Sequence, residues 1–194
     1  MNKEKIHEYI DEQIKSTLSL KENYEVFEKI FNVLKNARDK GKQVFVMGNG
    51  GSASTASHFV ADLLKTSITQ ENKRFKAISL SDNIPVLLAW SNDELYDNIF
   101  SNQLENFLEK DDIVIGISGS GNSKNVLNAI QLANEKHATT IGLNGKGGGK
   151  LSEIVKINLT IKSDDMLTIE TIHLLICHLL TTMIRSDGTP KFNY

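Results

Sequence analysis

Apolar residues in the first forty positions recur at the spacing of amphipathic helices. Ile6, Ile10 and Ile14 lie four apart, and further apolar residues follow at helical spacing. A break near residues 19–24 predicts two helices rather than one. Gly41 is typical of the residue that follows a helix, so we expect the second helix to end there.

From residue 43 onward, short β-rich apolar runs alternate with helical patterns. The expected strands are 43–47, 75–80, 113–118, 139–143 and 155–161. The expected helices are 52–64, 85–90, 96–108, 123–136 and 166–184. Strands that alternate with helices predict βαβ units and a parallel sheet covered on both faces. Residues 145–149 are expected to form a loop, and the tail over residues 186–194 a frayed end.

The length of 194 residues predicts a single domain over residues 1–194. We expect an α/β fold, a three-layer α/β/α sandwich around the parallel sheet. The helices of residues 1–40 form an N-terminal extension, and their apolar faces need a surface to pack against. We therefore expect them to contribute to packing between subunits.

Charge and cysteine content narrow the class of protein. The net charge of −2 gives no electrostatic reason to expect nucleic acid, although it allows a small basic pocket for one phosphate. The single cysteine, Cys177, cannot form an internal disulfide, which fits a reducing compartment. The N-terminus lacks the apolar core of a signal peptide, and no apolar run is expected to approach the roughly 18 residues of a membrane span. We expect a cytoplasmic protein without membrane contact.

Two strand-to-helix junctions are rich in Gly and Ser. The first reads GNGGS at residues 48–52 and the second SGSGNS at residues 118–123. Glycines let the backbone approach an anion, and the N–H groups and dipole at a helix start attract it. Ser118, Ser120 and Ser123 add hydroxyl donors. One such loop is also how an ordinary helix begins, but two after different strands indicate an anion site.

The same loops restrict the kind of anion. Neither loop has the Lys-Ser or Lys-Thr of the Walker pattern, and neither has the GxGxxG spacing of a dinucleotide site. A monophosphate is therefore favoured over a nucleotide.

Two pairs of polar residues are spaced to share helix faces. His58 and Asp62 are four apart, and Glu170 and His178 are eight apart. Two imidazoles and two carboxylates are a plausible zinc set. The alternatives are a solvent-facing Asp62 and a His178 buried without function among leucines and isoleucines. His173 lies either near Glu170 or in the core.

Together these motifs resemble a known family. ISGSGNS after a strand resembles the signature of the sugar isomerase (SIS) domain, and GNGGSASTASHF with IHLLICHLL is similar to its phosphoheptose isomerase branch. The resemblance covers essentially the whole chain. It implies a flavodoxin-like sandwich and a homotetramer whose active sites are shared between subunits. The implied reaction converts sedoheptulose 7-phosphate into glycero-manno-heptose 7-phosphate for surface-polysaccharide heptose.

The resemblance also implies roles for the four polar residues. Its zinc ligands correspond to His58, Asp62, Glu170 and His178, with Asp62 as the base and His178 as the general acid. Here Asp stands where the family has Glu, and a base that is one methylene shorter can cost ~100-fold in rate. Glu stands at 170 where the family has Gln, and its added negative charge strengthens cation binding.

The remaining implied positions bind substrate. They are Asn49, Gly50, Gly51, Ser52, Asn92, Asp93, Ser118, Gly119, Ser120, Ser123 and Glu170. Gly119 replaces a Thr that is common in the family, which removes one hydroxyl. Without the resemblance, Asn92 and Asp93 would be read as a helix cap or turn.

Two other functions stay open at this point. One is isomerisation of another phosphosugar, since no spacing rule identifies the residues that measure sugar length. The other is a non-catalytic SIS protein that binds a phosphosugar or a partner. The retained acid–base residues favour an enzyme, whereas the changes at 62 and 170 favour the second alternative.

Overall fold

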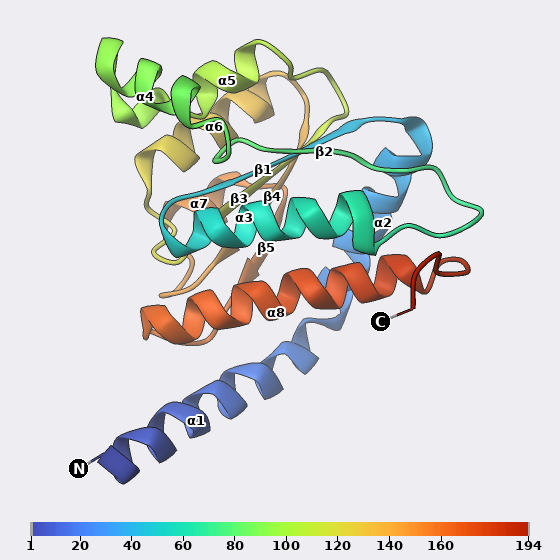
Figure 1. Ribbon diagram of the computed structural model, residues 1–194. Coiled ribbons are helices and arrows are strands. Elements are labelled where there is room, and N and C mark those ends of the chain that lie inside the picture. Colours follow the sequence, from blue (N-terminus) through green and yellow to red (C-terminus); the bar gives the residue numbers. More distant parts are fainter. Residues whose placement is uncertain (1, 194) are drawn as a thin grey trace.

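A five-stranded parallel sheet forms the middle of the protein in the computed structural model, which describes residues 2–193 (Figure 1). The strands are β1 (Gln43–Gly48), β2 (Lys76–Ser79), β3 (Ile113–Ser118), β4 (Thr139–Asn144) and β5 (Ile157–Thr160). Their order is β2-β1-β3-β4-β5, with every neighbouring pair parallel. This is the flavodoxin-like order. The predicted α/β class and parallel sheet are confirmed.

Helices connect and cover these strands. They are α1 (Asn2–Ser19), α2 (Tyr24–Lys40), α3 (Gly51–Ala61), α4 (Ile84–Asp93), α5 (Ser101–Glu105), α6 (Lys124–Glu135), α7 (Gly149–Ile154) and α8 (Met166–Arg185). Two short 3₁₀ turns are η1 (Leu20–Asn23) and η3 (Tyr96–Asn98), and one π turn is η2 (Asp62–Thr66). The 3₁₀ turn η1 is the break that the sequence predicts between the first two helices.

Two predicted elements differ from the structure. The helix expected over residues 96–108 is divided into η3 and α5. Ser101 Oγ donates to the Asn98 carbonyl at 3.1 Å, and such local side-chain bonds compete with a continuous helix. The helix α7 was not expected. It begins at Gly149, the last residue of the loop expected over residues 145–149, and the fifth strand starts at Ile157 rather than at residue 155.

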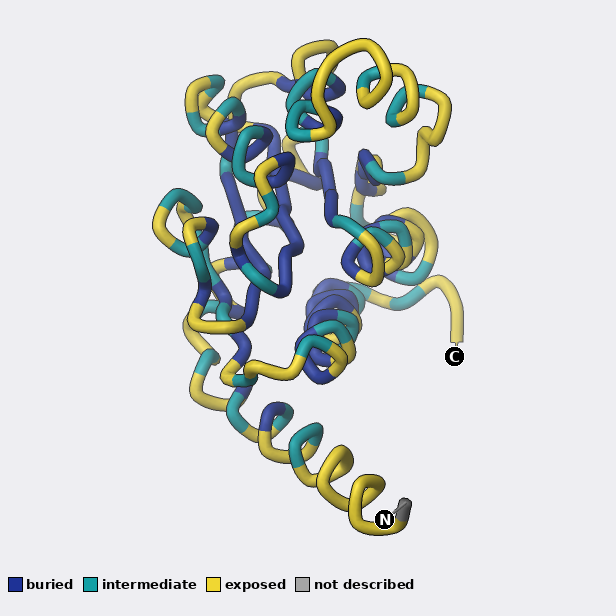
Figure 2. Tube along the Cα trace, turned by 90° about the vertical axis from the view of Figure 1, so that its left-hand side faces the viewer, coloured by how far each residue is buried: buried dark blue, intermediate teal, exposed yellow. Residues whose placement is uncertain are grey.

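Two hydrophobic cores lie on opposite faces of the sheet. Alternate strand residues point to opposite sides, so Val44 and Val46 face α2, α3 and α8, whereas Phe45 and Met47 face α5, α6 and α7. All four of these side chains are fully buried. Figure 2 shows the buried strands between two helical layers. Coverage on both faces explains why the strands are apolar runs rather than alternating patterns.

The helix α8 has the length of a membrane span but packs within the fold. By length and composition alone it is apolar enough to cross a membrane, with a mean hydropathy of 1.6 over its most apolar window. Half of that window is buried within the protein, where Ile172, Ile176 and Leu180 pack in the core beneath the sheet. The apolar composition of α8 therefore has a structural cause in this fold, because the helix fills the core between α3 and α2.

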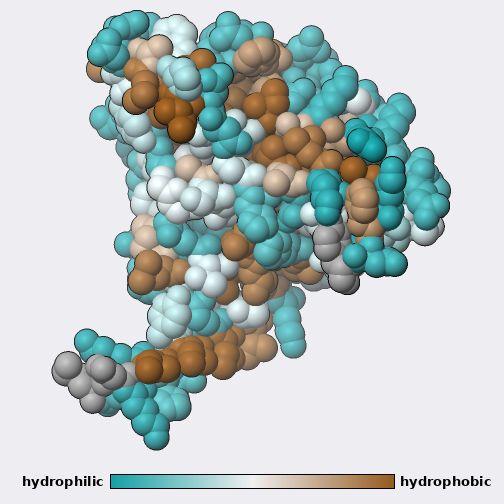
Figure 3. Space-filling view, viewed as in Figure 1, coloured by the Kyte–Doolittle hydropathy of each residue, from teal (hydrophilic) through white to brown (hydrophobic). Residues whose placement is uncertain are grey.

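The helix α1 extends away from the body and carries an apolar stripe (Figure 3). The large exposed side chains of the stripe are Ile6, Tyr9, Ile10, Ile14 and Leu18. Gln13 lies on the same face of α1, and its Nε2 donates to Thr168 Oγ1 of α8 at 2.7 Å. At the base of α1, Leu20, Phe27 and Leu175 help to line an apolar cavity of about 460 Å³.

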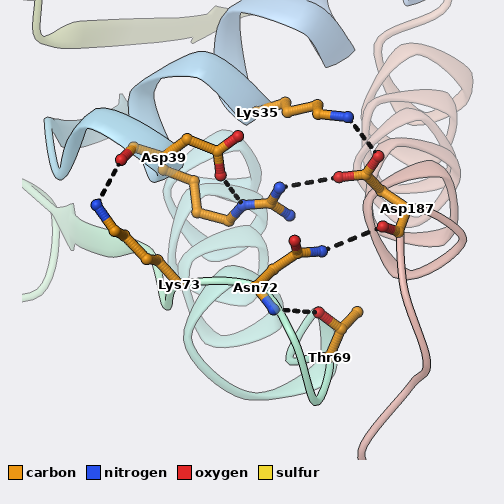
Figure 4. Close-up of polar contacts among 7 residues, drawn as sticks. Lys35, Asp39, Thr69, Asn72, Lys73 and Asp187 are labelled. Carbon is orange, nitrogen blue, oxygen red and sulfur yellow. Dashed lines mark hydrogen bonds and ion pairs between the residues drawn. The ribbon is translucent and has the colours of Figure 1, made fainter.

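The C-terminal tail is held in place, whereas the sequence predicted a frayed end. Lys35 and Arg38 on α2 both bond to the Asp187 carboxylate, at 2.5 and 2.9 Å (Figure 4). Asn72 Nδ2 donates to the Asp187 carbonyl, and an antiparallel bridge joins Thr69 to Pro190. The tail therefore ties α2 to the segment that follows η2.

The Asp187 contacts are expected to stabilise the fold. Arg38 is only 2% exposed, so its guanidinium needs a partner. We expect Asp187→Asn to lower the free energy of unfolding by about 2 kcal/mol, as measured by urea denaturation. The hydrogen bond from Lys35, and then that from Arg38, lower the pKa of Asp187 below its ordinary value of 3.8. The stabilisation is therefore present above pH 3.8 and lost as pH falls through the folded-state pKa.

The matched control is Asp164→Asn, which removes an exposed carboxylate without a described partner. Equal stability of the Asp164 and Asp187 variants would contradict a stabilising role for the tail.

Candidate functional site

The two Gly/Ser-rich loops lie side by side at the carboxyl ends of β1 and β3. These strands are neighbours, and the strand order reverses between them. The helix α3 leaves β1 toward the face of the sheet that α2 and α8 also cover, whereas α6 leaves β3 toward the opposite face, which α5 and α7 also cover. In open parallel sheets, a crevice forms where consecutive connections part in this way, and ligands bind there.

The second loop is shaped to receive an anion. Ser118 Oγ and Ser123 Oγ lie 3.0 Å apart, and Ser120 Oγ accepts a hydrogen bond from the Asn122 backbone. Ser123 turns its hydroxyl toward Ser118 and makes no side-chain cap to α6. The N-terminus of α6 therefore keeps its capacity for a negatively charged ligand.

The Gly-rich loop 145–149 supports the second loop from beneath, a role that the sequence did not reveal. The Gly145 N–H donates to the Gly119 carbonyl at 3.1 Å, and the Leu151 N–H donates to the Gly121 carbonyl at 2.9 Å. Gly121 has a φ of +64°, and a Cβ there would lie 1.9 Å from the Gly148 oxygen. The run of glycines after β4 was the available signal, because such close backbone contact excludes side chains.

At Gly119, the space that a side chain would need is already filled. A Cβ at this position would lie 2.4 Å from Met166 Sδ. Met166, at the start of α8, therefore packs where the missing side chain would stand.

In the first loop, the Asn49 side chain bonds to the helix that follows the second loop, and Ser52 is buried. The Asn49 side chain forms hydrogen bonds with Asn125 at the start of α6 and with Tyr96 in η3. Ser52 is only 5% exposed, and its N–H donates to the Asn49 carbonyl. Gly50 has a φ of +54° and lines a cavity with Asn49, whereas Gly51 begins α3.

The helices α3 and α8 bring together three of the four predicted metal-binding residues. The Nε2 atoms of His58 and His178 lie 3.1 Å apart. Asp62 Oδ2 lies 3.8 Å from the first nitrogen and 3.7 Å from the second. Asp62 begins the π turn η2, in which the Ser67 N–H donates to its carbonyl at 2.8 Å. Both imidazoles are about half exposed, and the carboxylate lies beneath them.

This cluster could hold a small divalent cation. The three ligand atoms lie within 4.8 Å of one another. Ligands of one tetrahedral zinc, each about 2.0–2.2 Å from the ion, lie roughly 3.3 Å apart, so small movements would suffice. Asp62 Oδ2 is buried and has no hydrogen-bond partner among residues 2–193. A buried carboxylate oxygen of this kind needs a compensating positive charge or donor, which a metal ion provides.

Glu170 lies apart from the cluster of His58, Asp62 and His178. Eight residues of helix rise about 12 Å, so Glu170 is two turns from His178 along α8. Its carboxylate instead lies against Gly51, where a Cβ would be 2.3 Å from Glu170 Oε2. A carboxylate at the first turn of α3 interacts favourably with the helix dipole.

Two neighbouring groups on α8 are buried. His173 faces the core, and burial lowers its pKa to about 4, partly opposed by the Asn144 carbonyl. The ring is therefore neutral at pH 7. Burial, followed by the nearby Asp62 charge, raises the pKa of the Cys177 thiol. Neither side chain faces the crevice.

Asn92 and Asp93 are the last residues of α4 rather than a turn. Both are exposed, and Asn92 Nδ2 donates to Asp93 Oδ1 at 2.8 Å. They point to solvent as a pair, available to a ligand or to another chain.

Comparisons with known proteins show relatives of this chain in both sequence and fold. The SIS domain family matches residues 8–145. A phosphoheptose isomerase of Geotalea daltonii is 40% identical over 155 residues, which are 80% of each chain. One from Helicobacter hepaticus is 39% identical over 160 residues, covering 82% of this chain and 81% of that one. The structure of a phosphoheptose isomerase from Francisella tularensis superposes with a TM-score of 0.90 at 28% identity, covering 96% of this chain and 99% of that chain.

The close approach of Glu170 to Gly51 is testable. Gly51→Ala would place a methyl group on the Glu170 carboxylate, so we expect the free energy of unfolding to fall by about 1 kcal/mol. Glu170→Ala in the same chain removes the conflict and should restore most of that loss, because contacting residues are coupled. Thermal or urea unfolding of both single variants and the double variant measures this. Costs that simply add would contradict the contact.

Proposed function

Since this chain belongs to the SIS domain family, we propose that it is a phosphoheptose isomerase. It converts sedoheptulose 7-phosphate into D-glycero-D-manno-heptose 7-phosphate, a step of heptose biosynthesis. The proposal draws on relatives of that name at about 40% identity. It places the protein among soluble biosynthetic enzymes, and a cytoplasmic location remains our expectation. We also retain one SIS domain over residues 1–194 as a proposal.

The observation that carries the proposal is the cluster of His58, Asp62 and His178, which α3, η2 and α8 bring together. Aldose–ketose isomerisation moves a proton between adjacent carbons through an enediol, so it needs a base and an acid that face one substrate. A carboxylate beneath two exposed imidazoles supplies both kinds of group. A module that only bound phosphosugars would not need them.

Ser118, Ser120 and Ser123 are proposed to bind the phosphate at the start of α6. At α3 the first turn already faces the Glu170 carboxylate, which disfavours a second anion there. The sugar therefore runs from the second loop toward α3 and α8, with its carbonyl end at the cluster. We propose that Asn49, Gly50, Gly51 and Ser52 line its path, and that Gly119 lies beside the phosphate. Asn92 and Asp93 are proposed to contact the sugar hydroxyls.

The proton transfers follow from these positions. Asp62 takes a proton from C1 of the ketose while His178 donates one to the carbonyl oxygen at C2, which yields the enediol. Asp62 then returns its proton to C2, and His178 accepts the proton of the hydroxyl at C1. The product is the aldose, and both side chains regain their starting states.

We propose zinc as the metal ion, held by His58, Asp62 and His178, with Glu170 as a further oxygen ligand if its side chain turns from Gly51. When bound, zinc would act as a Lewis acid on the substrate oxygens. His178 cannot bind an ion through Nε2 and donate from Nε2 at the same moment. Its two roles therefore make opposite predictions for metal-free protein.

Turnover of sedoheptulose 7-phosphate, followed by NMR with and without added zinc, tests the activity. We expect His178→Ala and Asp62→Asn to lower kcat by at least about 100-fold, because each removes a proton-transferring group. His137→Asn is the matched control, since it removes an exposed imidazole at a position of positive φ that Asn tolerates.

Each outcome of this assay has a meaning. If activity increases with added zinc until one zinc ion is bound per chain, the result supports the ligand role of His178. Full activity without metal supports its role as the acid. Tight binding without turnover of this substrate or a panel of phosphosugars would overturn the isomerase in favour of a binding protein.

We further propose a homotetramer with shared active sites, joined in part through α1. The exposed apolar stripe of α1 and the apolar cavity at its base support a partner surface. Exposed apolar surface of this extent is typical of contacts between subunits. A second copy of the chain would cover the stripe with its own α1.

Light scattering tests the assembly. We expect a mass about four times the 21.6 kDa of one chain. Ile10→Glu and Ile14→Glu together should lower the mass, because they place two charges within the apolar stripe. Lys15→Glu, which adds a carboxylate on the polar side of α1, should not. A monomeric wild-type chain would remove the shared-site proposal.

A further inference from the structure

We propose that Tyr96 and Asn125 are positioning residues that hold the side-chain amide of Asn49 as a hydrogen-bond donor to the substrate. The inference rests on the proposed function, because it concerns how a substrate-binding residue of that site is oriented. An asparagine amide carries both an acceptor oxygen and a donor nitrogen, and the two ends have nearly the same shape. Something must decide which end faces the ligand.

The orientation is set from the backbone of α6. The Val126 N–H donates to Asn125 Oδ1 at 3.0 Å, so the oxygen of Asn125 must lie on that side. Asn125 is 2% exposed, which leaves its amide no room or solvent for another arrangement. Its Nδ2 therefore faces Asn49.

Asn49 and Asn125 form a reciprocal pair. Asn125 Nδ2 donates to Asn49 Oδ1, and Asn49 Nδ2 donates to Asn125 Oδ1, both at 2.9 Å. The Tyr96 hydroxyl adds a second donor to Asn49 Oδ1 at 2.8 Å. Both lone pairs of that oxygen are then occupied. One hydrogen of Asn49 Nδ2 remains without an acceptor in the part of the chain that the structure describes, so the amide can offer a ligand only a donor.

The Asn49 side chain connects the two strand-to-helix junctions. Asn49 belongs to the loop after β1, and Asn125 belongs to the helix that follows β3, so the pair spans the point where the strand order reverses. Tyr96 and Asn49 also line a cavity of about 190 Å³ with Gly48 and Gly50. A phosphosugar presents hydroxyl and phosphate oxygens there, and each can accept the remaining hydrogen of Asn49 Nδ2.

Tyr96 is exposed, but its segment is anchored. Asn128 Nδ2 donates to the Asp97 carbonyl at 3.0 Å and to Asn98 Oδ1 at 3.1 Å, which ties η3 to α6. Ile99 follows directly and is 3% exposed. The hydroxyl of Tyr96 is thus held over Asn49 by the same helix that carries Asn125.

The test is a double-mutant cycle on binding of sedoheptulose 7-phosphate, measured by calorimetry. Tyr96→Phe should raise Kd about 5-fold, since it removes one hydrogen bond from the amide. Asn125→Asp should raise Kd at least about 10-fold, because it turns an oxygen toward Asn49 Oδ1 and favours a flipped amide. In an Asn49→Ala background, Tyr96→Phe should change Kd by less than about 2-fold.

Controls and a second readout complete the design. Asn32→Asp, which alters an exposed residue of α2, should leave Kd unchanged. In ligand-free protein, Tyr96→Phe should lower Tm less when Asn49 is already Ala, which reports the contact without any substrate. His58 variants, by contrast, should not couple to Tyr96.

The outcomes separate the two proposals. If the effects of the Tyr96 and Asn49 substitutions on Kd are coupled but the wild-type protein does not turn over the phosphosugar, the isomerase proposal is overturned and the positioning role is supported. If the wild-type protein turns over the phosphosugar but the Tyr96 and Asn49 substitutions have additive effects on Kd, only the positioning role is overturned. No binding of the phosphosugar by the wild-type chain overturns both.

Discussion

The reversal of strand order between β1 and β3 is the constraint on which the rest of this structure depends. All five strands run parallel, so each connection must cross one face of the sheet and cover it. Because β1 connects toward one edge and β3 toward the other, α3 and α6 leave neighbouring strands for opposite faces. Only there do two loops and two helix starts lie open beside each other. The Gly/Ser-rich loops occupy that place.

The proposed acid–base groups depend on a second contact, the packing of α3 against α8. His58 on α3 and Asp62 at the start of η2 lie one turn apart, and His178 reaches them from α8. Both helices are fixed by the core that lies between them and the sheet, in which α8 buries one side completely. The distances within the cluster are therefore set by helix packing rather than by loop conformation, which holds the three side chains in a fixed arrangement.

The sequence predicted the parts of the site that depend on local pattern. The glycines and serines of both loops, and the spacing of His58 and Asp62, are visible within a few residues. The pairing of α3 with α8 became an expectation only through the family resemblance, since no local rule places His178 beside Asp62. Spacing alone also grouped Glu170 with His178, yet the structure places its carboxylate against Gly51.

Other features escaped the sequence because they join distant segments. The bonds among Asn49, Tyr96 and Asn125 span 76 residues, and none of the three stands out by composition. The sequence predicted a frayed tail because the polar residues there have no helical or strand pattern. Its order comes from the Asp187 contacts with α2 and from the bridge to Thr69. Tertiary contacts supplied what propensity did not.

The separation of the two cores has a consequence for how such a protein can change over generations. The proposed proton-transferring groups lie on elements of one core, whereas the proposed phosphate loop leads into a helix of the other, and the sheet stands between them. Substitutions that repack one side need not disturb the other. Asp62 and Glu170 both belong to the side of α3 and α8. Side chains of the proposed acid–base site can therefore change while the backbone of the loop after β3 stays in place.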